Sequence, residues 1–228
     1  MNKLKFTLTI FLSFFILELS HAQDWANLNR YKDDNSKIGL PKDGENRVVF
    51  MGNSITDFWI KNCPEYFSDN AYFDRGISGQ TSPQMLVRFR ADVIKLNPAV
   101  VTILAGTNDI AGNTGPSTLE MIADNIFSMV ELAKSNGIKV ILCSVLPVYD
   151  YPWKPGLSPA EKIVKLNEII KNYADSNEII YLDYYSAMVD NRKGMKAEYS
   201  EDGVHPNKAG YKVMMDLCDQ AINQALLK

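Results

Sequence analysis

The sequence predicts an α/β fold, a three-layer sandwich in which one parallel sheet of five strands lies between two layers of helices. Apolar runs of strand length alternate five times with longer segments of helical periodicity, which is typical of a parallel sheet with right-handed crossovers. Runs such as residues 99–105 are apolar except for Thr102, as expected for strands covered on both faces. Hydrophobic residues make up 46% of the 228 positions, which is enough for a single domain with a sizeable core.

Residues 1–22 differ from the rest of the chain. Two lysines precede an apolar run, and small residues close it, which is the pattern of a secretory signal peptide. We therefore expect cleavage before Gln23, an exported protein in the periplasm or outside the cell, and one catalytic domain over residues 23–228. An N-terminal membrane anchor is the alternative, but the apolar run is short for a bilayer span, so no stable membrane insertion is expected after cleavage.

Composition argues against several classes of partner and cofactor. The net charge is −3, or −4 without residues 1–22, which hold two lysines and one glutamate, and no basic tract suggests nucleic acid. Three widely spaced cysteines argue against a disulfide framework, although they still allow one disulfide bond. His205 is the only histidine after residue 22, so a zinc site lacks ligands, and we expect neither a metal nor an organic cofactor.

The elements follow one another with recognisable boundaries. The strands are expected at residues 48–51, 71–73, 99–105, 138–145 and 178–182. The helices are expected at residues 25–31, 55–67, 82–96, 117–135, 158–175, 184–189 and 207–228. Pro64 should interrupt the second helix, and Ser82 as cap with Pro83 at the first helical position should open the third. Gly137 should end the long helix before it, and Asn207 should cap the last one.

The expected strand order is 2-1-3-4-5, as in flavodoxin-like domains. In that order the first and third strands are neighbours, and their carboxyl ends flank the position where ligands bind in such sheets. Ser54 follows the first strand, Gly79 the second and Asn108 the third. Three polar loops are therefore expected to meet at one cleft.

Ser54 lies in the turn after the first strand. Its hydroxyl becomes a nucleophile only with a base, a group that orients the base, and donors for an oxyanion. The turn is not the G-x-S-x-G elbow of α/β-hydrolases, because Thr56 stands in place of the second glycine. A helix cap is the alternative role for Ser54.

Asp202 and His205 supply the missing base and its orienting group. An aspartate three residues before a histidine on a tight turn can hold one ring nitrogen, and the other is then free to accept the Ser54 proton. The alternative is an Asp-Gly turn that leads into the last helix. The presence of a serine without another base favours the catalytic assignment.

Gly79 and Asn108 are the candidate oxyanion donors besides Ser54 itself. Gly79 can offer its backbone N–H at close approach because it has no side chain, and Asn108 can offer its side-chain amide. A turn glycine and an asparagine that bonds its own loop are the alternatives.

Four blocks of the sequence resemble a known family, the SGNH hydrolases or GDSL esterase/lipase superfamily. The resemblance lies in Gly-Asn-Ser-Ile-Thr at 52–56, Gly79, Gly-Thr-Asn-Asp at 106–109 and Asp-Gly-Val-His-Pro at 202–206, in the order of the family's blocks. It covers about residues 46–228. It implies an ester hydrolase with Ser54 as nucleophile, His205 as base and Asp202 as orienter. It further implies an oxyanion hole made by the Ser54 and Gly79 N–H groups and the Asn108 amide.

One departure from the family pattern is visible at Asn53, where the family usually has aspartate. Asparagine is nearly isosteric with aspartate and can still make the bonds of a turn. The substitution therefore bears on the fine geometry of the turn more than on activity.

The loop at residues 147–156 follows the fourth strand and is rich in aromatic residues. Tyr151 and Trp153 can stack on a sugar or shield an acyl group, or their rings can serve only to pin the loop. Export, a small domain and this loop favour a short acyl ester as substrate, acetyl on a carbohydrate. One alternative is a lysophospholipase or thioesterase of the same superfamily, which would hydrolyse a small-molecule ester of another class. The other is a glycan-binding module that has the fold but no turnover.

Overall fold

The sheet has the predicted topology. The computed structural model describes residues 24–227, so the expected signal peptide lies outside the described residues. The strands are β1 (Val48–Gly52), β2 (Tyr72–Gly76), β3 (Val100–Ile103), β4 (Lys139–Cys143) and β5 (Ile180–Leu182). They pair in parallel in the order β2-β1-β3-β4-β5, which confirms the expected fold class.

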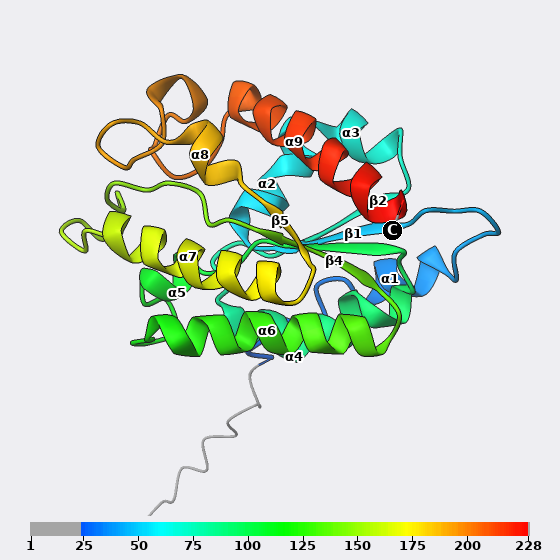
Figure 1. Cartoon of the computed structure of the whole chain (residues 1–228). Helices are drawn as coiled ribbons and strands as arrows, with labels where there is room; N and C mark the ends of the chain where they lie inside the picture. Colours follow the sequence, from blue (N-terminus) through cyan, green and yellow to red (C-terminus); the bar gives the residue numbers. More distant parts are fainter. Residues whose placement is uncertain (1–23, 228) are drawn as a thin grey trace, which may run out of the picture.

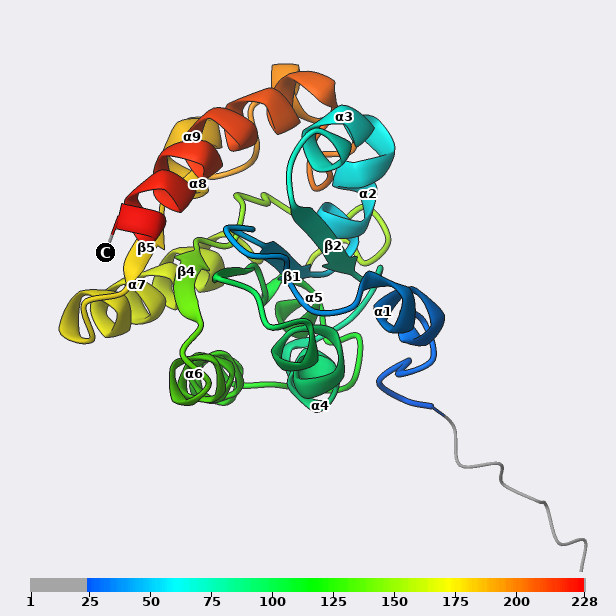
Figure 2. The same cartoon turned by 90° about the vertical axis from the view of Figure 1, so that its right-hand side faces the viewer.

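Helices cover both faces of this sheet, as Figures 1 and 2 show. The α-helices of residues 24–227 are α1 (Lys32–Ile38), α2 (Ser54–Asn62), α3 (Pro64–Ser68), α4 (Ser82–Asp92), α5 (Thr107–Ile110), α6 (Leu119–Ser135), α7 (Ala160–Ser176), α8 (Tyr184–Met188) and α9 (Lys208–Leu227). Two short 3₁₀ turns are η1 (Ile94–Leu96) and η2 (Ala197–Tyr199). One layer contains α4, α6 and α7, and the other contains α2, α3, α8 and α9.

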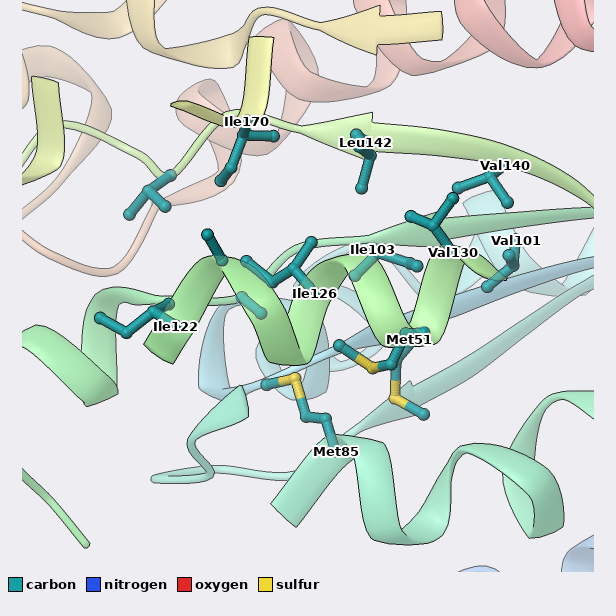
Figure 3. Close-up of a cluster of buried hydrophobic side chains, with 14 of the residues drawn as sticks. Met51, Met85, Val101, Ile103, Ile122, Ile126, Val130, Val140, Leu142 and Ile170 are labelled. Carbon is teal, nitrogen blue, oxygen red and sulfur yellow. The ribbon is translucent and has the colours of Figure 1, made fainter. Parts of the chain in front are cut away.

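The two layers are built by the alternation of side chains along each strand. On β1, Val49 and Met51 belong to the core under α4 and α6, while Val48 and Phe50 belong to the core under α2 and α9. Figure 3 shows the first of these cores, where Met51 of β1 lies close to Met85 of α4. Both faces of the central strands are thus buried, which explains why the strands read as continuous apolar runs.

The N-terminal helix lies later in the chain than the sequence suggested. Residues 25–31 form turns, and α1 begins at Lys32, so the expected helix at 25–31 is wrong. Asn27 has a φ of +54°, which a helix does not allow. The Asp24 carboxylate accepts hydrogen bonds from the backbone N–H groups of Leu28 (2.7 Å) and Asn29 (2.9 Å). This side chain therefore holds the segment as a turn instead of a helix.

The start of α4 also differs by one residue. Thr81, not Ser82, is the N-cap, and Gln84 reaches back to accept a hydrogen bond from the Thr81 N–H (3.1 Å). This is the capping-box pattern of a threonine followed three residues later by glutamine. Pro83 consequently occupies the second helical position. In contrast, the expected cap of the last helix is confirmed, because Asn207 Oδ1 accepts from the Gly210 N–H (3.1 Å).

Arg88 of α4 is fully buried and joins the helix to the end of β1. Its guanidinium donates to the Asp92 carboxylate (3.0 Å), to the Gly52 carbonyl (3.0 Å) and to Gln80 Oε1 (2.6 Å). Asp92 is also buried, at 1% exposure. A buried ion pair of this kind is costly to break from one side, because the remaining charge is left without its partner.

We expect Arg88→Met to lower the free energy of unfolding by about 3–5 kcal/mol, since the Asp92 carboxylate is left buried without its counter-charge. Lys171→Met is the matched control, because Lys171 and Asp175 form an ion pair with the same i,i+4 spacing but with both side chains more than half exposed. Its expected cost is about 0.5 kcal/mol or less. Urea unfolding of the two variants beside wild type measures both values, and equal losses would contradict the argument.

No helix within residues 24–227 combines the length and the apolar character needed to span a bilayer.

Candidate active site

Ser54 is the first residue of α2, directly beyond the end of β1. Asn53 is the N-cap of this helix, and its Oδ1 accepts from the Ile55 N–H (3.0 Å), so the turn bond expected of asparagine is formed. Gly52 is required here, because a Cβ at that position would lie 2.0 Å from the Thr56 hydroxyl oxygen. The tight passage from strand to helix places the Ser54 hydroxyl at the carboxyl end of the sheet.

The three predicted catalytic side chains meet in one hydrogen-bonded chain. Ser54 Oγ lies 2.9 Å from His205 Nε2, and His205 Nδ1 lies 2.7 Å from Asp202 Oδ2. Ser54 is 7% exposed, so the nucleophile candidate is largely screened from solvent. The carboxylate on Nδ1 favours the tautomer that leaves Nε2 free to accept a proton from the hydroxyl.

The Asp202 carboxylate is oriented from its other side by the turn itself. Asp202 Oδ1 accepts from the backbone N–H groups of Val204 (2.9 Å) and His205 (2.8 Å). Partial burial raises the pKa of this carboxyl, but the bonds from the His205 ring and these N–H groups outweigh it and hold the pKa below its usual value. Asp202 therefore stays ionised beside the imidazole.

Ser200 is a member of this turn that the sequence did not single out. Its hydroxyl lies 2.8 Å from the His205 carbonyl and 3.1 Å from Asp202 Oδ1, and its one proton serves either acceptor. The backbone at Ser200 also pairs with Pro206 across the turn. The loop is therefore closed on itself around the Asp–His pair.

Hydrogen bonds join the loop after β2, which carries Gly79, to the loop after β3, which carries Asn108. Both residues are predicted oxyanion donors. The Asn108 Nδ2 donates to the Gln80 carbonyl (3.0 Å), and the Asn113 Nδ2 donates to the Gly79 carbonyl (3.0 Å). Gly79 has a φ of +80° with open space around it, so its backbone is accessible to a ligand. Ser54, at the start of α2, has a backbone N–H that no helical carbonyl can accept.

Asp109, the last residue of the third sequence block, fastens these loops to α4. Its carboxylate accepts from the Ser82 backbone N–H (2.9 and 3.0 Å) and from the Ser82 hydroxyl (2.6 Å). Burial raises the pKa of Asp109 although the Ser82 bonds oppose the shift. Asp109 is thus a positioning group for the loop that carries Asn108, a role that the spacing in the sequence did not reveal.

The two aromatic candidates of the loop after β4 have different surroundings. Tyr151 is 0% exposed, and its hydroxyl donates to the Thr107 carbonyl (2.7 Å), so the prediction that its ring contacts substrate is wrong. Tyr151 instead pins the loop beside the Asn108 turn. Trp153 is 48% exposed, and its ring centroid lies 6.1 Å from that of His205. Phe58, which the sequence did not single out, is also close to His205, with 5.1 Å between ring centroids.

Asp74 of β2 is a second buried carboxylate close to these loops. Its Oδ1 accepts from the Gly76 N–H (2.8 Å), and its Oδ2 has no hydrogen-bond partner among the described residues. Burial raises the pKa of Asp74 to about 7. The folded protein therefore keeps a proton that the unfolded chain releases near the ordinary pKa of 3.8.

We expect Asp74→Asn to gain stability relative to wild type as the pH rises from 4 to 7. In wild type, the folded state holds a proton on Asp74 that the unfolded chain has released over this range, so the free energy of unfolding falls by at most about 1.4 kcal/mol per pH unit through this group. The asparagine has no proton to release, so the variant does not lose this part of its stability as the pH rises. Urea unfolding at a series of pH values measures the difference, with the exposed Asp43→Asn as control, which should run parallel to wild type. A difference between Asp74→Asn and wild type that does not change with pH would contradict the assignment.

Within residues 24–227, no group of three or more histidine, cysteine or acidic side chains is arranged to hold a metal ion.

Comparison with known proteins shows the family of the chain. A family model described as the GDSL-like lipase/acylhydrolase family matches residues 50–213, which is more than half of the chain. The chain belongs to this family. The GDSL-like acylhydrolases are ester hydrolases, and the matched range includes Ser54, Asp202 and His205.

The chain is similar to a solved GDSL-like lipase and to two esterases. A crystal structure of a GDSL-like lipase from Bacteroides thetaiotaomicron is 50% identical, covers 88% of this chain and 98% of its own, and has a TM-score of 0.86. A multidomain esterase of Ruminococcus flavefaciens is 32% identical over 53% of this chain, which spans only 15% of that protein. An acetylxylan esterase of Xylanibacter ruminicola is 27% identical over 81% of this chain, which spans 45% of that protein.

Proposed function

We propose that this protein is an exported serine esterase that removes short acyl groups, acetyl above all, from carbohydrates. The observation that carries the proposal is the chain of two hydrogen bonds from Ser54 Oγ through the His205 ring to Asp202, at 2.9 and 2.7 Å. These are the distances at which a hydroxyl, a base and an orienting carboxylate act together.

In the proposed reaction, His205 Nε2 takes the Ser54 proton as Oγ attacks the ester carbonyl carbon. The imidazolium, held by Asp202, then gives this proton to the leaving alcohol oxygen, and an acyl-serine remains. Water attacks the acyl-serine by the same route in reverse: His205 takes a proton from the water and returns it to Ser54. The cycle needs no metal or organic cofactor.

The developing oxyanion is proposed to be bound by the Ser54 and Gly79 N–H groups and the Asn108 amide. One Asn108 amide hydrogen is already bonded to the Gln80 carbonyl (3.0 Å), which sets the plane of the amide. Donors that are oriented before the reaction stabilise the transition state without reorganisation. The bond thus supports Asn108 in this role.

A carbohydrate ester is supported by two independent features. Trp153 presents a half-exposed indole close to His205, the residue that is proposed to protonate the leaving alcohol. An aromatic face there suits the alcohol half of a sugar ester. The similarity to an acetylxylan esterase favours the same class.

Rates on para-nitrophenyl esters of two to twelve carbons, measured beside acetyl release from acetylated xylo-oligosaccharides, test the proposal. We expect the highest kcat/KM on the acetyl ester and release of acetate from the glycan. A maximum at eight or more carbons without glycan deacetylation would favour a lysophospholipase or thioesterase. Glycan binding without turnover of any ester would favour the binding-module alternative.

A further inference from the structure

An open depression of about 320 Å³ borders the loop that carries Gly79. Its walls come from three parts of the chain: the N-terminal turn at residues 24–27, the loop after β2 together with the first turn of α4, and residues 113–114 after α5. Apart from Trp25, Ile77 and Gly79, the residues that line it have amide, hydroxyl or carboxylate side chains. The depression is therefore polar, and one large aromatic residue forms part of its wall.

Hydrogen bonds fasten these three walls to one another. The Gln80 Nε2 donates to the Ala26 carbonyl (2.8 Å), and the Gln84 Nε2 donates to the Trp25 carbonyl (2.6 Å). On the other side, Asn113 holds the Gly79 carbonyl (3.0 Å). The shape of the depression is thus set before a ligand arrives, which lowers the entropic cost of binding.

The backbone at Trp25 is held by its own turn. The Asp24 carboxylate fixes the turn through the Leu28 and Asn29 N–H groups, which also hold the pKa of Asp24 below its usual value. Within this fixed turn the Trp25 side chain remains 47% exposed. An ordered backbone thus presents a large aromatic side chain to solvent beside the proposed oxyanion position.

This combination suits a sugar ring better than an acyl chain. An indole face covers the C–H face of a sugar, while hydroxyl, amide and carboxylate side chains bond its hydroxyl groups. An acyl chain in the same place would cover polar surface with which it can form no hydrogen bond, whereas sugar hydroxyl groups can bond to it. The chemistry of the lining therefore selects a carbohydrate.

We propose that this depression is a sugar-binding subsite, in which Trp25 is the stacking platform for a unit of an oligosaccharide ester bound at Ser54. The inference rests on the proposed function and deepens it. With Trp153 beside His205, the enzyme then has two aromatic contacts, one close to the proposed base and one beside the loop that carries Gly79. Recognition extends beyond the acetylated unit, so longer oligosaccharides bind better than shorter ones.

The kinetic test compares acetylated xylo-oligosaccharides of two to six units with para-nitrophenyl acetate. In Trp25→Ala, we expect the ratio of kcat/KM on the longest oligosaccharide to kcat/KM on para-nitrophenyl acetate to fall about tenfold, mainly through KM, as for loss of one aromatic contact. Trp25→Phe should restore most of the ratio. Leu28→Ala is the matched control, because Leu28 is 42% exposed in the same segment and does not line the depression. Thermal melts check that all three variants are folded.

A binding measurement separates this inference from the proposed function. Calorimetry with unacetylated xylo-oligosaccharides should show binding to wild type that Trp25→Ala weakens about tenfold and Leu28→Ala leaves unchanged. Such binding without deacetylation would overturn the proposed reaction and support the subsite. Deacetylation with the same ratio and the same affinity in Trp25→Ala and wild type would overturn the subsite and leave the reaction intact. If wild type neither bound nor deacetylated the oligosaccharides, both proposals would be overturned.

Discussion

Ser54→Ala is expected to lower kcat by about 10⁴-fold or more, the scale of triad knockouts in serine proteases. The reason is chemical: without Oγ, His205 has no nucleophile to activate, and no acyl-serine forms. The variant should remain folded, because Ser54 is at the first position of α2 and the cap of that helix is Asn53. Turnover of para-nitrophenyl acetate by the two proteins measures the loss.

Covalent labelling adds a second measurement of the same assignment. An organophosphate should add one phosphoryl group to wild type, located on Ser54 by peptide mass, and none to Ser54→Ala. Ser135→Ala is the control, because Ser135 lies exposed at the end of α6 and bonds only within its helix. It should be labelled as fast as wild type. Activity or labelling retained in Ser54→Ala would end the proposal that Ser54 is the nucleophile.

Asp202→Asn is expected to lower kcat/KM by about 10³–10⁴-fold, close to the loss known for the equivalent change in a serine protease. The asparagine oxygen can still accept the Val204 and His205 N–H bonds, so the turn should persist. Its amide N–H would then face His205 Nδ1 as a donor. The imidazole would respond by carrying its proton on Nε2, the nitrogen that has to accept the Ser54 proton.

The control for this variant is Asp190→Asn. Asp190 has a similar place in another loop, because its Oδ1 accepts the backbone N–H groups of Arg192 and Gly194 at 2.8 Å each. Rates near wild type are expected, since no base depends on Asp190. If Asp202→Asn were as fast as wild type, the Asp202–His205 pair would be only a turn that leads into α9.

The order and type of the elements could be read from the sequence because those signals are local. A run of apolar residues predicts a buried strand wherever it lies in the chain, and the polar loops that follow three of the strands predict one cleft. The candidate triad residues could be proposed for a similar reason. His205 had no competitor as a base, and Asp202 lies within reach of it along the backbone.

The burial of a side chain and its long-range hydrogen bonds depend on residues that are distant in the sequence. The sequence alone therefore did not predict them. Trp153 and Tyr151 belong to the same loop, yet one is half-exposed and the other is buried against Thr107. Nothing in the local pattern distinguishes them. Nor does it show that the Asp24 side chain, and not a helix, shapes residues 25–31.

The sequence by itself determined the parallel α/β sheet and its strand order, and it singled out Ser54, Asp202 and His205 as candidates for one site, because each depends on periodicity, chain order or the scarcity of one residue type. Only the tertiary structure decided which side chains support them. Arg88 and Asp109 belong to the architecture of the site because the fold brings α4 against the ends of β1 and β3. Such contacts join residues that are tens of positions apart, and their energy comes from burial, which no short stretch of sequence specifies.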